Sequence, residues 1–273
     1  MADNKTQFSN SWAIILGGSS GFGFAAVEKL AADGMNIAVL YRETAITERP
    51  LKQKFIKLTE INNVNICPFN INALDLSGLN SFIEQFSTVA NGKKCVRLLL
   101  HSIARGNLKP LALPVDFQDN NEETLSAEDI KFTTYAMGTS LLDWTRGILN
   151  AGLFADDARI IGLTSEGAHK YWQGYAAVSI AKAALESLNT YMAVEFGKYG
   201  LKTNLIQAGI TETPSLRKID ESEKLIALAK ERNPLGRITT PRDVANVISL
   251  LCTDEAAWIN GSIIHVDGGE HCR

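Results

Sequence analysis

The sequence predicts one doubly wound α/β domain, with a parallel sheet of about seven strands and helices on both faces. Short apolar runs of strand length recur along the chain, separated by segments with apolar residues at three- and four-residue steps. Strand followed by helix, repeated, builds a parallel sheet that is buried on both sides. The 273 residues, 45% of them hydrophobic, suffice for one sizeable core, so we expect residues 1–273 to form a single domain.

The strands follow from the apolar runs, taken in order. They are expected at 12–17, 36–41, 64–70, 96–102, 158–165, 201–209 and 262–269. Between the first two, "GFAAVEKLAADG" has helical spacing and glycine after its last turn, which often terminates a helix. Residues 175 to about 196 have the same spacing and predict a long helix.

Two segments interrupt this alternation. Residues 105–130 form a long polar connection after the fourth strand, and residues 211–240 contain an amphipathic piece after the sixth. Both follow carboxyl ends of strands, where open α/β sheets bind their ligands. We interpret them as walls of a pocket, with a substrate lid around 211–240; solvated surface loops are the alternative.

Charge and composition exclude several classes of function. The formal net charge is -3 and the pI about 5.9, so no basic surface indicates nucleic acid as a partner. The polar opening lacks the features of a secretory signal, and the longest apolar runs are too short to span a membrane, so we expect a cytoplasmic protein. The four cysteines and four histidines have no ligand-like spacing, which argues against a metal.

A glycine-rich turn follows the first strand. "LGGSSGFGF" places Gly17, Gly21 and Gly23 before a helix, so that the backbone can turn sharply and a pyrophosphate can meet the exposed amides of the helix start. This predicts a dinucleotide site of the Rossmann type, and a merely tight turn is the alternative. The remaining contacts expected from the turn are Ser19, Ser20 and Phe22.

The end of the second strand selects between the two nicotinamide nucleotides. "AVLYRET" places Tyr41 and Arg42 where an acid would bind both ribose hydroxyls, and a guanidinium there can pair with a 2′-phosphate. NADPH is therefore favoured over NADH. In the competing interpretation Arg42 is an ordinary exposed arginine and Glu43 binds the ribose.

Tyr175 and Lys182 are the candidate catalytic pair. Seven residues apart on a helix, they lie on one face about 10 Å apart along the axis. Val178, one turn before Lys182, cannot donate a proton. Taken alone, the pair is typical of a packed tyrosine and a solvated lysine.

The glycine turn, the helix with Tyr175 and Lys182, "LKTNLIQAGITET" and "NGSIIHVDGG" resemble the short-chain dehydrogenase/reductase superfamily over nearly the whole chain. Most members have Tyr-x-x-x-Lys, which requires tyrosine at 178. This chain has "HSIA" (101–104) in place of Asn-Asn-Ala-Gly, Ala208-Gly209 in place of Pro-Gly, and no asparagine within 131–149. Together these departures resemble the divergent enoyl-acyl carrier protein reductases.

Within that subgroup the chain is similar to an NADPH-using bacterial type, which keeps the glycine triplet and has a second tyrosine four residues before the first. Here Tyr171 precedes Tyr175 in this way. The resemblance implies that Tyr171 is a second candidate donor, with an aromatic wall of the acyl channel as the alternative. Ser165 occupies the place of the catalytic serine of ordinary members, or is a structural hydroxyl.

The spacing suits conjugate reduction of an enoyl thioester. Hydride adds to the β-carbon while negative charge collects on the thioester oxygen, two carbons further away, so the hydrogen-bond donor must move outward. One helical turn supplies about 5 Å. Tyr175 is expected to stabilise the enolate oxygen, and Lys182 to hold the nicotinamide ribose.

The resemblance also implies further cofactor contacts. Asn70 and Ile71 are expected to flank the adenine, and Ser102, Ile103 and Ala104 the adenine ribose and the nicotinamide side. The nicotinamide carboxamide and the start of the lid are assigned to Ala208, Gly209, Ile210, Thr211 and Thr213.

The implied activity is reduction of a trans-2-enoyl thioester on acyl carrier protein, in fatty-acid or related acyl-chain synthesis, by a homotetramer. Basic side chains of the lid that could receive the acidic carrier are Arg217, Lys218, Lys224, Lys230 and Arg232; the alternative for them is solvated helix charge. Two other functions stay open: a reductase of a ketone or a secondary-metabolite intermediate, and an NADP-binding protein without catalysis.

Overall fold

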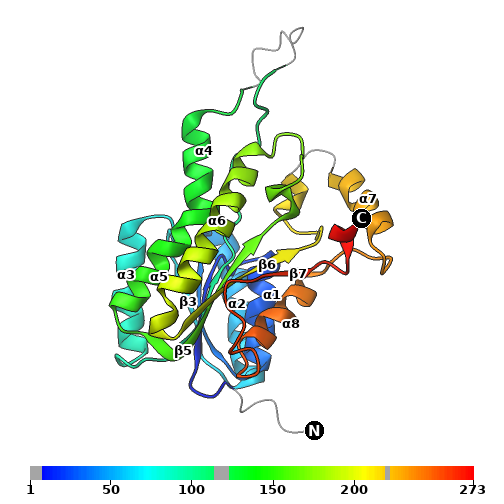
Figure 1. Ribbon diagram of the computed structural model, residues 1–273. Helices are drawn as coiled ribbons and strands as arrows, with labels where there is room; N and C mark the ends of the chain where they lie inside the picture. The colour runs from blue at the N-terminus through cyan, green and yellow to red at the C-terminus, as the bar shows by residue number, and fades with distance from the viewer. Residues whose placement is uncertain (1–7, 114–122, 219–221) are drawn as a thin grey trace.

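The computed structural model describes residues 8–113, 123–218 and 222–273. Residues 1–7 of the polar opening, residues 114–122 of the predicted connection and residues 219–221 of the predicted lid lie outside this part. A parallel seven-stranded sheet forms the centre of the molecule, in the order β3-β2-β1-β4-β5-β6-β7 (Figure 1). The predicted fold class is confirmed.

Each predicted strand is present, with ends that differ by a few residues. The strands are β1 (Trp12–Leu16), β2 (Asn36–Tyr41), β3 (Ile66–Asn70), β4 (Val96–His101), β5 (Phe154–Thr164), β6 (Leu201–Ala208) and β7 (Ile263–Val266). β5 begins four residues before its predicted start, because Phe154 is buried beside Val96 of β4. The central strands are buried on both faces, which explains their continuous apolar runs.

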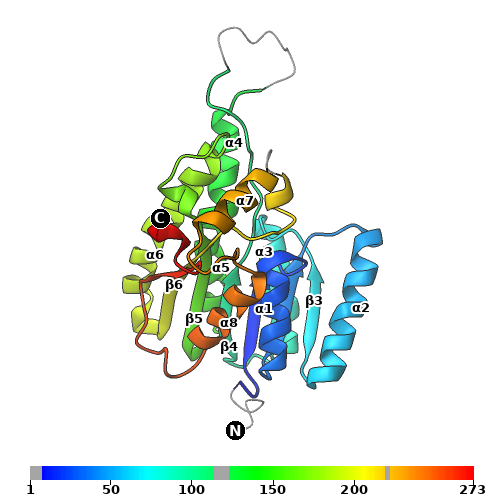
Figure 2. The same ribbon diagram turned by 90° about the vertical axis from the view of Figure 1, so that its right-hand side faces the viewer.

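Helices cover both faces of the sheet (Figures 1 and 2). One face packs against α1 (Gly21–Ala32), α2 (Ala45–Asn62) and α8 (Pro241–Leu251). The other packs against α3 (Leu76–Val89), α5 (Ser140–Asn150) and α6 (Ala176–Glu195). α4 (Ala127–Thr134) leads into a π-helical turn, Tyr135–Thr139, and α7 (Ser222–Arg232) lies after β6.

Two sequence expectations change in detail. The connection after β4 ends earlier than predicted, because Ser126 and Asp129 form a capping box that starts α4 at Ala127. Tyr175 is the N-cap residue of α6, so it precedes the helix that we expected to contain it. No helix in the described ranges is both long and apolar enough to cross a bilayer.

Candidate functional site

Two adjoining cavities open at the carboxyl end of the sheet. The first is lined by the glycine turn, the tip of β2 and the start of the loop after β3. The second, of about 300 Å³, is lined by the ends of β5 and β6, by α6 and by the C-terminal segment. Both include Phe22, Ser102, Ile103, Ala104 and Thr213, so they form one continuous cleft.

The glycine turn has the geometry that a pyrophosphate needs. Gly17 has φ +85°, and a Cβ there would fall 2.5 Å from the Ser102 carbonyl oxygen, so the chain requires glycine. Ser20 is the N-cap of α1 without a side-chain capping bond, which leaves the first amides of the helix free to meet an anion. Gly23 does not line the cleft; a Cβ there would fall 2.2 Å from the Gly17 oxygen, so it lets α1 pack on the turn. These residues fit a bound dinucleotide.

At the far end of the first cavity, Arg42 is exposed, and Glu43 and Thr44 line the wall beside it. The Glu43 carboxylate accepts a hydrogen bond from the Thr47 hydroxyl at 2.8 Å. Tyr41 lines the same cavity, but it is only 3% exposed and its hydroxyl donates to Glu48. Its hydroxyl is therefore held away from a nucleotide.

The structure separates Asn70 from Ile71. Ile71 lines the first cavity, as expected. Asn70 does not, because its amide group pairs with the backbone of Glu43: Oδ1 accepts from the Glu43 N–H at 3.0 Å and Nδ2 donates to the Glu43 carbonyl at 2.9 Å. Asn70 thus joins the tips of β2 and β3, and its side chain does not line the cavity where adenine is expected. The cavity gains Asn72, Ala73 and Leu74 instead, from the turn after β3.

Tyr175 stands at the entrance to α6 with its ring against the short turn after β5. Its hydroxyl donates to Ser165 Oγ at 3.4 Å, and Ser165 Oγ also accepts from the Gly167 N–H. A Cβ at Gly167 would fall 2.5 Å from the Tyr175 ring, so glycine permits this close packing. Burial raises the pKa of Tyr175, and the bond to Ser165 opposes this only in part. The phenol therefore stays protonated and can act as a donor.

Tyr171 is not brought to the site. Its side chain is 90% exposed and does not line either cavity. Trp172 lines the second cavity instead, with its ring centroid 6.3 Å from that of Tyr175. Among the tyrosines of the described residues, Tyr175 alone lines that cavity. The expectation that Tyr171 faces the substrate is therefore corrected. The indole of Trp172, and not the ring of Tyr171, forms an aromatic part of the cavity wall.

Lys182 is held by backbone carbonyls. It is 5% exposed, and its Nζ donates to Leu163 O at 2.7 Å and Met137 O at 3.1 Å. Met137 lies in the π-helical turn, where the usual helical pairing is interrupted and a carbonyl can accept a bond from outside. Burial lowers the pKa of Lys182 to about 8, while the charge of Glu186 raises it. The lysine is thus a buried cation whose protonation changes near neutral pH.

Val178, which lies between Tyr175 and Lys182 in the sequence, is buried and lines the cavity. The position from which an ordinary member of the superfamily would present its phenol is therefore apolar here. The phenol of Tyr175 and the ammonium of Lys182 both line the same cavity.

The remaining nicotinamide-side residues also line the second cavity. Among those expected there, the structure places Ala208, Gly209, Ile210, Thr211 and Thr213 in its wall. Thr164 and the C-terminal residues Asp267, Glu270 and His271 join them. No sequence pattern marks the last three as site residues, because only the return of the chain after β7 brings them to the cleft.

The basic side chains of the lid divide into two groups. Arg232 points inward: its Nη2 donates to Glu166 Oε2 at 2.6 Å and to Glu270 Oε1 at 2.7 Å. Because Glu166 and Glu270 line the cavity, Arg232 attaches the end of α7 to its wall, and the expected role of Arg232 in receiving a carrier is wrong. Arg217 and Lys230 are exposed, and the Lys218 side chain lies outside the described part.

Comparisons with known proteins agree with this geometry. Residues 17–271 match the family model described as enoyl-(acyl carrier protein) reductase. The chain belongs to this family. The resemblance to a divergent short-chain dehydrogenase/reductase of the enoyl reductase type is confirmed, and the chain is an oxidoreductase that uses a nicotinamide dinucleotide.

Relatives in this enoyl reductase family cover most of the chain. The enoyl-[acyl-carrier-protein] reductase [NADH] FabI of Enterococcus faecalis is 27% identical over 91% of this chain and 91% of its own length. The FabI of Aquifex aeolicus, also named as an NADH enzyme, is 31% identical over 72% and 68%. A crystal structure of the Aquifex aeolicus VF5 enzyme covers 98% of both chains with a TM-score of 0.80 at 24% identity, a likeness of fold.

Within the described ranges, no three His, Cys, Asp or Glu side chains gather into a group that could hold a metal ion. The cleft is lined by hydrogen-bonding groups and by apolar side chains. Its donors include the Tyr175 phenol and the Lys182 ammonium, and its walls combine apolar residues such as Met137 and Trp172 with the charged groups around Arg232.

Proposed function

We propose that this enzyme uses NADPH to saturate the carbon–carbon double bond of a trans-2-enoyl thioester, carried by acyl carrier protein, in fatty-acid or related acyl-chain synthesis. One observation supports this above the others. Tyr175 lines the cavity from the N-cap of α6, whereas Val178 occupies the position one turn before Lys182. The donor is thus set outward, as charge on a distant thioester oxygen requires.

Different residues would have different roles in this reaction. The bound nicotinamide would supply hydride to the β-carbon of the enoyl group. Tyr175 would donate its hydrogen bond to the thioester oxygen as negative charge develops there, an interaction that strengthens in the transition state. Lys182 would bind the ribose and place a positive charge near that oxygen. Met137, Trp172 and Val178 would exclude water from the acyl group.

The preference for NADPH is supported by Arg42. Its side chain is exposed beside the wall formed by Glu43 and Thr44, at the start of α2, where a 2′-phosphate could pair with the guanidinium and with helix amides. The Glu43 carboxylate already accepts from Thr47, which weakens the case for its binding the ribose. Because the two FabI relatives described above are named as NADH enzymes, the two cofactors must be compared directly.

A homotetramer and a lid around 211–240 remain part of the proposal. The outer face of α6 exposes Ile180, Tyr191 and Val194, which supports a contact between copies. The attachment of Arg232 to Glu166 and Glu270 supports a lid closed on the cleft. Light scattering of the purified chain would measure the oligomeric state.

The test is a turnover assay with crotonyl thioesters of acyl carrier protein and of coenzyme A, following loss of reduced cofactor with NADPH and NADH in parallel. We expect turnover of the carrier thioester with NADPH and no oxidation of NADPH by simple ketones. Turnover of carbonyl substrates alone would assign a ketone reductase. NADPH binding by fluorescence, without turnover of any enoyl substrate, would assign a non-catalytic binding protein.

A further inference from the structure

Glu186 lies one helical turn beyond Lys182 on α6, with a side chain only 10% exposed. Two groups fix its carboxylate. The Thr164 hydroxyl donates to Oε1 at 2.6 Å from the end of β5, and His169 Nε2 contacts Oε2 at 2.6 Å. His169 is mostly exposed, so the carboxylate is held between the core and the surface. Such a short, two-sided arrangement fixes where the negative charge lies.

Lys182 forms no direct ion pair with any residue that the structure describes. Its Nζ donates to two neutral carbonyls, Leu163 O and Met137 O, which satisfy N–H groups but do not balance a charge. A buried ammonium in that state loses its proton easily, and burial does lower the pKa of Lys182 to about 8. A nearby negative charge must oppose the loss of this proton if Lys182 is to act as a cation.

The ionisable groups around Lys182 come from β4 and from α6 with its N-cap. His101, at the end of β4, is neutral, because burial and then the charge of Lys182 lower its pKa to about 3. Tyr175, at the start of α6, is neutral because burial raises its pKa. Glu186, on α6 itself, raises the pKa of Lys182 by its charge. It is thus the counter-charge among the described residues.

We propose that Glu186 is a positioning residue that keeps Lys182 protonated in the working enzyme, with Thr164 and His169 holding its carboxylate in place. The proposal rests on the proposed function, in which Lys182 acts as a cation beside the cofactor ribose. A merely structural role, joining α6 to β5, would need only a hydrogen-bond acceptor for Thr164. A glutamine can supply that acceptor but not the charge, so Glu186→Gln separates the two roles.

The experiment compares wild type and Glu186→Gln in turnover of crotonyl thioester across pH. Turnover should fall as pH rises through the pKa of Lys182, and in Glu186→Gln this alkaline limb should move to lower pH by about one unit. At mildly acidic pH, where Lys182 is protonated in both proteins, turnover should stay within about twofold of wild type. Glu186→Asp, which keeps the charge, should restore much of the profile.

Two controls belong with it. Glu195→Gln removes an exposed carboxylate near the end of the same helix and should leave the profile unchanged. His169→Gln keeps a hydrogen-bond donor beside Glu186 and should leave the alkaline limb in place. A Glu186→Gln protein that loses turnover equally at every pH would overturn the proposal and leave a structural tie only.

The pH dependence of NADPH binding, measured by fluorescence, distinguishes this result from failure of the proposed function. It needs no enoyl substrate, and Lys182 is expected to contact the cofactor. A shifted binding profile in Glu186→Gln without enoyl turnover would keep Glu186 in its role and reject the substrate. Enoyl turnover with unshifted profiles would do the reverse.

Discussion

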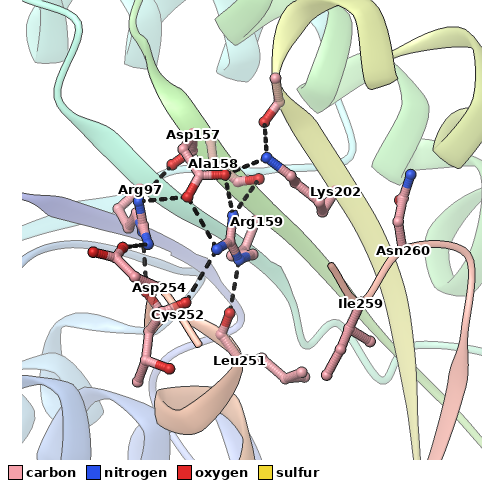
Figure 3. Close-up of polar contacts among 12 residues, drawn as sticks. Arg97, Asp157, Ala158, Arg159, Lys202, Leu251, Cys252, Asp254, Ile259 and Asn260 are labelled. Carbon is pink, nitrogen blue, oxygen red and sulfur yellow. Dashed lines mark hydrogen bonds and ion pairs between the residues drawn. The ribbon is translucent and has the colours of Figure 1, made fainter. Parts of the chain in front are cut away.

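A buried cation lies near each end of the paired region of strand β5, Arg159 on the strand itself and Lys182 on α6, and the two have different surroundings. Toward the amino end, Arg159 is 1% exposed and uses all five of its N–H donors (Figure 3). Asp157 accepts from its guanidinium at 2.6 and 3.0 Å. At the carboxyl end, Lys182 contacts the Leu163 carbonyl, and its counter-charge, Glu186, lies one turn away.

The surroundings of Arg159 fix charge permanently. Its Nε donates to Leu251 O and Nη2 to Thr253 O, so it also caps the last turn of α8. Burial alone would raise the pKa of Asp157, but bonds from Arg159 and Lys202 and the charges of Arg159 and Arg97 lower it to about 2. Asp157 therefore stays ionised at neutral pH. The ion-paired cluster at the amino end of β5 therefore contributes to stability. Lys182 at the carboxyl end can gain or lose a proton near pH 8.

Arg159→Met should have the largest effect on stability. It removes one partner from a buried ion-paired cluster and uncaps α8, so we expect the free energy of unfolding to fall by about 3–5 kcal/mol. Denaturant unfolding measures this. The control is Lys94→Met, which breaks the exposed pair with Asp156 and should cost no more than about 1 kcal/mol. Turnover per folded molecule should stay near that of wild type, because the cluster does not line the cleft. A loss of turnover without a loss of stability would contradict the purely structural role of Arg159.

Tyr175→Phe should lower turnover, whereas Arg159→Met should lower stability. Loss of the donor to the thioester oxygen should lower kcat at least tenfold, about 1.4 kcal/mol in activation free energy, with NADPH affinity near normal. Steady-state kinetics and a fluorescence titration check this. Tyr171→Phe is the matched control and should be neutral, since Tyr171 is exposed outside the cleft. Unchanged turnover in Tyr175→Phe would remove the phenol from its role.

Lys182→Met should lose turnover and keep or gain stability, because it replaces an incompletely balanced buried charge with an apolar chain. The lowered pKa of Lys182 also determines whether stability rises or falls with pH. The folded pKa, about 8, lies below the ordinary value of 10.5, so between these values the unfolded chain binds more protons and wild-type stability rises with pH. Thermal unfolding across this window should show the rise in wild type and not in Lys182→Met. A less stable variant lacking this difference would place Lys182 with Arg159 as a structural cation.

Arg42→Ala should weaken NADPH binding by about tenfold and NADH binding by much less, because a charge-assisted contact to the 2′-phosphate is lost. Fluorescence titrations with both cofactors measure the ratio. Arg49→Ala, an exposed arginine on α2 that does not line the cavity, should change neither. Equal losses for the two cofactors would contradict the assignment of Arg42.

The parts of this molecule that depend on local pattern could be predicted from sequence. Apolar runs located every strand, since parallel strands buried on both faces leave little ambiguity. The glycine turn was predictable because Gly17 needs both a positive φ and a close approach to Ser102. The capping box at the start of α4 could also be recognised, since Ser126 and Asp129 lie three residues apart. The predicted connection over 105–130 nevertheless includes this helix start.

The rest depends on contacts between distant segments. Nothing local marks the π-helical turn that offers the Met137 carbonyl to Lys182. Asn70 turned to the Glu43 backbone rather than to the cleft because two strand tips lie side by side. The same holds for Arg232, whose partners Glu166 and Glu270 are far away in sequence. Side-chain direction in loops is set by such partners, which sequence spacing does not reveal.

The most direct test of the central claim is a crystal structure of the ternary complex with NADPH and an unreactive enoyl thioester analogue. We predict the Tyr175 hydroxyl within about 3 Å of the thioester oxygen, with Lys182 on the nicotinamide ribose. A phenol turned away from the acyl group, or the reacting carbon seated against Val178 with no contact from Tyr175, would contradict the account.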